Sequence, residues 1–211
     1  MYLFKNKISK YLAILVGAFL LSVSFQQSAF ATTADASNFV NDLAERVIAI
    51  VKRKDLSEKD KEMKLNDIFV KSIDTKWIGR FSMGKYWRSL NPNQKSSYLN
   101  LYSDYLAGLY VPNFRKYTGN VIKINGSKEV RPNEYLVQTE LTDPLNSLNI
   151  KIDYRLVMKD SGFENFIIFD VIAEGVSLIT SQRAEINSVM EKNNFNYLMD
   201  LLTKKTEAHS K

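Results

Sequence analysis

Apolar residues recur at helical spacing through residues 37–117, with polar residues between them. Phe39 and Leu43, for example, lie four positions apart and fall on the same side of a helix. Ser57 and Asp60 lie where a second helix should begin, and a short third helical segment is expected to start near Asp74. The first half of the chain is therefore predicted to be helical, with a first helix followed by helices that begin near Ser57 and Asp74.

The longest predicted helix begins at Asn91 and Pro92, since Asn is a favoured cap and Pro a favoured first helical residue. It is expected to end near Pro112. Its stripe of large side chains consists of Tyr98, Leu101, Tyr102, Tyr105, Leu106, Leu109 and Tyr110. Four tyrosines on one helix fit a ligand wall with polar tips, but such a stripe is more typical of core packing.

The period falls to two between residues 120 and 173, which predicts four strands, the first three of them half-buried and antiparallel. Turns are expected between them, the first at Asn125-Gly126-Ser127. The fourth strand, residues 166–173, is apolar on both faces and is therefore predicted to be central in the sheet.

Helical spacing returns after Gly175 and predicts two closing helices, with a polar tail beyond Thr203 that we expect to fray. No linker or repeat divides residues 32–211, so they are predicted to form one domain with its core at about 38–203. The expected fold is α+β, with a helical layer on one face of a curved, mainly antiparallel four-stranded sheet.

The N-terminus has the pattern of a secretory signal peptide. Three lysines precede an apolar run over residues 11–25, and Ala29-Phe30-Ala31 follows it. Small residues on both sides of Phe30 suit signal peptidase, so cleavage is expected after Ala31. The alternative is an uncleaved anchor, although about 20 apolar residues are usual for a membrane span.

Charge and composition exclude several classes of chemistry. The chain has 29 basic and 23 acidic residues, and removing the three lysines of residues 1–31 leaves 26 against 23. This mild excess is unlike the concentrated basic charge of a nucleic-acid binder. The chain has no cysteine, and its single histidine, His209, lies in the tail, so thiol chemistry, histidine triads and the usual zinc sites are excluded.

Three carboxylates remain as candidates for acid or base catalysis: Asp153, Asp170 and Glu174. Asp170 is the most interesting, because counting by two places it on an apolar strand face with Ile168. A buried acid there would suit a general base, but it would equally accept hydrogen bonds from an arginine or a backbone turn. We favour the structural role.

Two blocks of sequence resemble the MlaC family of periplasmic phospholipid-binding proteins, the auxiliary component of a lipid ABC transport system that is also linked to toluene tolerance. The first runs from Arg80 to Arg88, RFSMGKYWR, and continues in YLAGLY at residues 105–110. The second and more specific block joins IDYRL at 152–156 to FDVIAEGVSLI at 169–179 and SQRAEI at 181–186. The resemblance covers most of residues 38–203.

The resemblance implies an apolar cavity between the helical layer and the sheet, which holds the acyl chains of a phospholipid as cargo and needs no other cofactor. It also implies a shuttle in the periplasm, which exchanges lipid between an outer-membrane lipoprotein complex and an inner-membrane ABC transporter complex and so maintains outer-membrane lipid asymmetry. Composition by itself does not distinguish such a cavity from a solid core.

Ten residues are candidates for the acyl-chain lining, although each would also suit an ordinary core. They are Trp77, Phe81, Leu101, Tyr105, Leu109, Val137, Ile152, Tyr154, Ile168 and Val171. Ile168 and Val171 conflict, because a regular strand would place them on opposite faces. Two other functions stay open: an enzyme with Asp170 or Glu174 as general base, and a non-binding periplasmic adaptor with a solid core.

Overall fold

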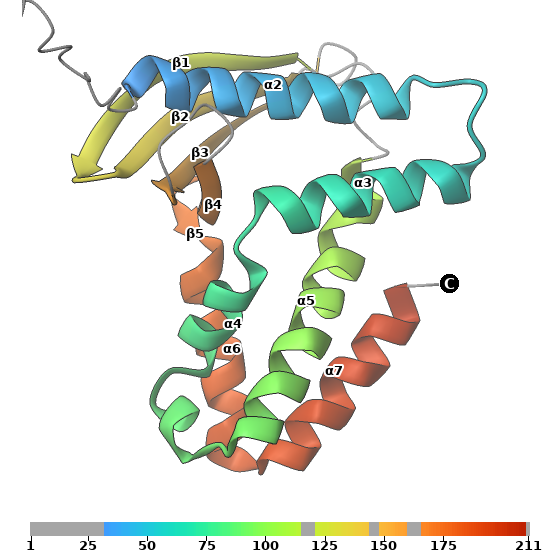
Figure 1. Cartoon of the computed structure of the whole chain (residues 1–211), viewed down its shortest axis with the longest axis vertical. Helices are drawn as coiled ribbons and strands as arrows, with labels where there is room; N and C mark the ends of the chain where they lie inside the picture. Colours follow the sequence, from blue (N-terminus) through green and yellow to red (C-terminus); the bar gives the residue numbers. More distant parts are fainter. Residues whose placement is uncertain (1–31, 115–120, 144–147, 160–165, 210–211) are drawn as a thin grey trace, which may run out of the picture. The chain divides into compact units, whose positions relative to one another are not determined.

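The computed structural model describes residues 32–114, 121–143, 148–159 and 166–209. Helices fill its first part and are shown with their labels in Figure 1. They are α2 (Thr33–Val51), α3 (Glu58–Ser72), α4 (Thr75–Met83), the 3-10 helix η1 (Gly84–Ser89) and α5 (Pro92–Phe114).

Side-chain caps fix where these helices begin. Ser57 and Asp74 accept hydrogen bonds from the backbone N–H groups of Asp60 and Trp77, so α3 and α4 begin where the sequence predicts helices to start. Asn91 and Gln94 form a reciprocal pair of such bonds at the start of α5. α2 begins four residues earlier than expected, because Thr32 and Asp35 form another capping box. α4 ends at Met83, just before Gly84, whose φ of 56° favours glycine.

The sheet follows, in the order β1-β2-β3-β4-β5 with every neighbouring pair antiparallel. Its strands are β1 (Val121–Arg131), β2 (Glu134–Asp143), β3 (Leu148–Met158), β4 (Phe166–Ala173) and the two-residue β5 (Val176–Ser177). The sheet curls without closing, with α2 along it (Figure 1). The predicted α+β fold is confirmed, and β5 adds a short fifth strand to the four expected.

Two predictions about the strands were wrong. Asn125-Gly126 forms no turn: β1 continues through it, with a shift of register against β2 that marks a β-bulge. β4 is not central, since only the two-residue β5 lies beyond it. β4 is apolar on both faces because α3, α4 and α6 (Leu178–Lys192) pack against it.

The chain ends in α7 (Phe195–His209), which packs against α5. The prediction of a frayed tail beyond Thr203 was wrong, because the helix continues to His209. Two contacts of Lys205 help to hold this end of α7 in place. Its ammonium pairs with Glu185 on α6 and lies 5.8 Å from the centre of the Tyr105 ring.

Buried apolar side chains form two separate clusters. One includes residues of each α-helix from α3 through α7 and contains the buried tyrosines Tyr98, Tyr102 and Tyr105. The other joins the first turns of α2, around Phe39, to the inner face of the sheet, around Leu156. The space between the two clusters contains the candidate site.

Candidate functional site

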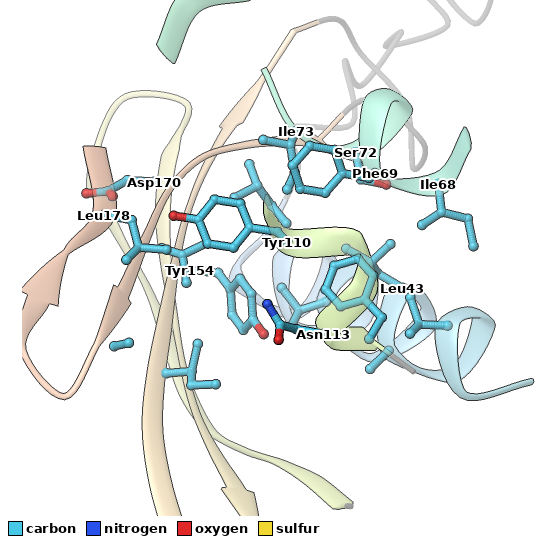
Figure 2. A pocket seen from close by; sticks show the side chains of 18 of the residues that line it. Leu43, Ile68, Phe69, Ser72, Ile73, Tyr110, Asn113, Tyr154, Asp170 and Leu178 are labelled. Carbon is cyan, nitrogen blue, oxygen red and sulfur yellow. The ribbon is translucent and has the colours of Figure 1, made fainter. Parts of the chain in front are cut away.

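An apolar cavity of about 410 Å³ lies between the sheet and the helices. This volume is within the roughly 300–1,000 Å³ range of small-molecule sites. Leu178 and Asp170 lie toward one side of it, and Leu43 and Ile68 toward the other (Figure 2). Its lining consists of Val40, Leu43, Ala44, Val47, Ile48, Ile68, Phe69, Ser72, Ile73, Ile78, Leu106, Tyr110, Asn113, Phe114, Ile122, Leu141, Ile152, Tyr154, Ile168, Asp170, Val171, Ala173, Leu178, Ile179 and Gln182.

α2 forms a wall that is apolar but incompletely buried. Its first turns pack on the sheet, where Ala36 and Val40 are buried. Further along, Leu43, Val47 and Ile48 line the cavity and remain half-buried. Apolar side chains in a closed core would be fully buried, so this wall presents apolar surface that a ligand can cover.

α5 forms the opposite wall with residues that share one side of the helix. Leu106, Tyr110 and Asn113 follow one another at intervals of four and three residues. The Tyr110 ring stacks on Phe69 of α3, with 6.4 Å between ring centres. Burial raises the pKa of Tyr110, so its hydroxyl is neutral at pH 7.

The cavity has a few polar groups, and Asp170 is the most buried of them, at 1% exposure. Its carboxylate accepts hydrogen bonds from the Ser177 hydroxyl at 2.8 Å and the Ile179 backbone N–H at 3.3 Å. Arg155 lies 3.6 Å away. Asp170 thus ties α6, whose first turn carries a positive partial charge, to the sheet. These partners fit the structural role that the sequence favoured.

Gln182 is the second polar group and belongs to a network of tyrosines. The Tyr102 hydroxyl donates to Gln182 Oε1 at 3.2 Å and lies 3.1 Å from Ser82 Oγ. Burial raises the pKa of Tyr102 above its ordinary value of 10.0. The network is fully protonated at neutral pH, so it joins α4, α5 and α6 without placing a charge at the cavity.

A β-bulge brings Ile168 and Val171 to the same cavity. Tyr154 pairs with Val171 and Arg155 with Asp170, but Leu156 pairs with Ile168, so β4 holds one extra residue, Phe169. The strand is therefore irregular, and the conflict between the two positions disappears. Of the ten residues predicted to line the acyl chains, the cavity includes these two together with Ile152 and Tyr154.

The other six candidates lie outside the cavity lining. Leu101, Tyr105 and Leu109 belong to the helical core cluster, and Val137 is fully buried beneath α2. Trp77 and Phe81 stack on each other on α4, with Trp77 41% exposed. The cavity receives Ile78 from α4 instead.

Sequence reasoning missed the part of the lining that α2 and α3 contribute. Leu43, Val47, Ile68 and Phe69 all line the cavity. Their helical spacing indicates helix packing and does not by itself distinguish a core from a cavity wall. No signal in the sequence identified Asn113 or Gln182 as residues of the cavity.

The lining suits an apolar ligand, because most of its side chains are apolar. Over the described ranges, no group of three His, Asp or Glu side chains could hold a metal ion. Within the same ranges, no helix has the length and apolar character that crossing a membrane requires. Glu174, another of the three candidate carboxylates, accepts a hydrogen bond from the Lys151 backbone N–H.

Comparisons with known proteins agree with this geometry. The fold matches the structure of the phospholipid-binding protein from Ralstonia solanacearum in complex with a phospholipid, with a TM-score of 0.71 and 16% sequence identity. The match covers 83% of this chain and 99% of that one. The sequence pattern of the MlaC protein family matches residues 41–204. The chain therefore belongs to the MlaC family.

Proposed function

We propose that residues 32–211 form a phospholipid carrier that holds acyl chains in the cavity and leaves the headgroup near solvent. The observation that carries this proposal is the half-buried apolar wall of Leu43, Val47 and Ile48, opposite Leu106 and Tyr110. The phospholipid bound by the Ralstonia protein of the same fold supports the same ligand class here.

The free energy of transfer explains why such a carrier is needed. Each buried methylene contributes about 0.8 kcal/mol, so two long acyl chains represent roughly 20 kcal/mol or more. A lipid with that cost of transfer to water does not cross an aqueous compartment at a useful rate. An apolar cavity offsets most of this cost, and its incomplete enclosure favours release.

The carrier is expected to act in the periplasm after cleavage of residues 1–31, a location supported by the basic, apolar and small-residue pattern of that segment. It would exchange phospholipid between an outer-membrane lipoprotein complex and an inner-membrane ABC transporter complex, and so maintain outer-membrane lipid asymmetry. Membership of the MlaC family supports these partners.

Enzymatic and purely structural alternatives have less support. Asp170 is engaged by Ser177, Ile179 and Arg155, and no histidine lies near it in the part of the chain that the structure describes. A general base needs an accessible lone pair aimed at its substrate. An adaptor with a solid core would not need the cavity.

Lipid extraction of residues 32–211 followed by mass spectrometry tests the proposal. We expect about one diacyl phospholipid for each protein chain. Because a ligand that binds only the folded state stabilises it, reloading the delipidated protein should raise its unfolding temperature. A folded protein with no lipid and no such shift would contradict the proposal.

A further inference from the structure

A surface rich in aromatic and basic residues lies outside the cavity, on α4, η1 and the start of α5. Residues 75–95 contain five basic residues and no acidic one. The rest of the mature chain then has 21 basic and 23 acidic residues. The net positive charge of the mature chain therefore comes entirely from this segment. The five are Lys76, Arg80, Lys85, Arg88 and Lys95.

Both tryptophans of the chain, Trp77 and Trp87, lie in the same segment. Trp77 is 41% exposed and stacks on Phe81, with ring centres 5.2 Å apart. Trp87 is half-buried, and the Lys95 ammonium lies 5.5 Å from the centre of its ring. Both tryptophans thus lie within the basic segment, and one of them has a lysine ammonium over its ring.

α6 adds a further cation to this surface. The Arg183 guanidinium lies 4.8 Å from the centre of the Phe81 ring, and α6 packs against both α4 and η1. Among the described residues, no carboxylate lies within ion-pair distance of Arg80, Arg88 or Arg183. Asp74, just before the segment, is already paired with Lys159 at 3.1 Å. The positive charge of the surface is therefore not neutralised internally.

We infer that this aromatic and basic surface, residues 75–95 with Arg183, binds the anionic headgroup surface of a phospholipid bilayer. Tryptophan favours the headgroup level of a membrane, and clustered Lys and Arg are attracted to anionic lipid. Lysines supply three of the five charges in the segment. Because a lysine ammonium is a point charge, it suits a diffuse anionic surface better than it suits a fixed pair of carboxylate oxygens.

The inference rests on the proposed function, because a carrier that exchanges phospholipid with complexes embedded in two membranes works close to the bilayer surfaces around them. None of the aromatic or basic residues of this surface lines the cavity, whereas Ile78 of the same helix does. α4 thus has one side toward the cargo site and another toward the proposed bilayer contact.

Vesicle binding by residues 32–211, which contain every described helix and strand, tests the inference. The probes are vesicles of phosphatidylcholine mixed with phosphatidylglycerol, and vesicles of phosphatidylcholine alone. We expect sedimentation with the anionic vesicles only, weakening with added salt. Tryptophan emission should shift to shorter wavelength on binding, because Trp77 leaves water.

Arg80→Gln with Arg88→Gln removes two exposed charges that have no internal ion pair among the described residues. Each basic residue at an anionic surface strengthens binding about fivefold, so the double variant should bind about 25-fold more weakly. The matched control is Lys123→Gln with Lys128→Gln, which removes two exposed charges from the edge strand β1. Circular dichroism establishes that both variants are folded.

Equal weakening by the two double variants would overturn the assignment of the surface, as would failure to bind the anionic vesicles. Binding to soluble polyglutamate without binding to vesicles would also overturn it, and would indicate an acidic protein face instead. Lipid extraction of the same samples separates the two proposals. Bound phospholipid without vesicle binding contradicts only this inference, and vesicle binding by a lipid-free protein contradicts only the proposed function.

Discussion

Ile168 and Val171 line the same cavity although three positions separate them on β4. Between these two positions β4 holds one more residue than β3, Phe169, whose ring contacts Trp77 edge-on with 5.3 Å between ring centres. A regular strand would turn one of the two aliphatic side chains away from the cavity. The bulge therefore widens the apolar face of β4 while it anchors α4 to the sheet.

This geometry predicts different outcomes for two neighbouring positions. Val171→Phe places a ring in the cavity and should lower the amount of phospholipid that co-purifies with the protein. Ile172→Phe makes the same kind of enlargement at a residue outside the lining and should leave lipid content near that of the parent protein. Phosphorus analysis of the two purified variants checks the difference, and equal lipid loss in both would count against the bulge as the cause.

Asp170→Asn should destabilise the domain without emptying the cavity. The substitution removes a charge that is 1% exposed, lies 3.6 Å from Arg155 and faces the first turn of α6. Weakening hydrogen bonds to a buried charged group costs about 2 kcal/mol in the free energy of unfolding. Urea denaturation measures this loss, with Asp153→Asn on β3 as the control. Full stability with complete loss of lipid would instead assign Asp170 to ligand binding.

Alkaline pH should unfold the domain through its buried tyrosines. Burial raises the pKa of Tyr98 and of Tyr102 above the ordinary value of 10.0, so both stay protonated in the folded state when an unfolded chain would ionise. The contribution of these two protonated hydroxyls to the free energy of unfolding is present below pH 10 and is lost as pH rises above it.

Tyr98→Phe should therefore make the fall in unfolding free energy above pH 10 less steep. It also removes the hydrogen bond to the Gly79 carbonyl, at a cost of about 1 kcal/mol near neutral pH. Tyr197→Phe, at a residue that is 50% exposed, provides the matched control. Urea denaturation at several pH values gives the slopes, and equal slopes in the two variants would rule out burial of Tyr98 as the cause.

Export should leave Thr32 as the first residue of the mature protein. The signal pattern ends at Ala31, and Thr32 is the cap of α2, so cleavage there would leave every described element complete. Intact mass of protein recovered from the periplasm checks this expectation. Retention of Met1 with the protein fixed in the inner membrane would indicate a tethered carrier.

Local chemistry explains which parts of the fold were predictable. Ser57, Asp74 and Asn91 cap helices through their own side chains and nearby backbone groups, so their effect is visible in a short stretch of sequence. Asn125-Gly126 has the same turn chemistry, but pairing with β2 holds it inside β1 as a bulge. A contact between distant segments thus overrides the local preference.

The cavity lining was less predictable because α5 is apolar on several sides. Tyr102 packs beside Gly79 on α4, Tyr105 belongs to the helical core cluster, and Tyr110 faces the cavity. Periodicity identifies such side chains as buried, but only the positions of neighbouring helices determine which of them meet a ligand. Family resemblance indicated that a cavity exists without locating its walls.

Phospholipid content of a matched pair of α2 variants tests the central claim most directly. Ala44→Trp places an indole in the cavity lining, whereas Glu45→Trp places one on the exposed side of the same helix. With both variants folded by circular dichroism, the proposed carrier predicts that Ala44→Trp loses its co-purified phospholipid and Glu45→Trp retains it. Equal phospholipid in the two variants would contradict binding of acyl chains in this cavity.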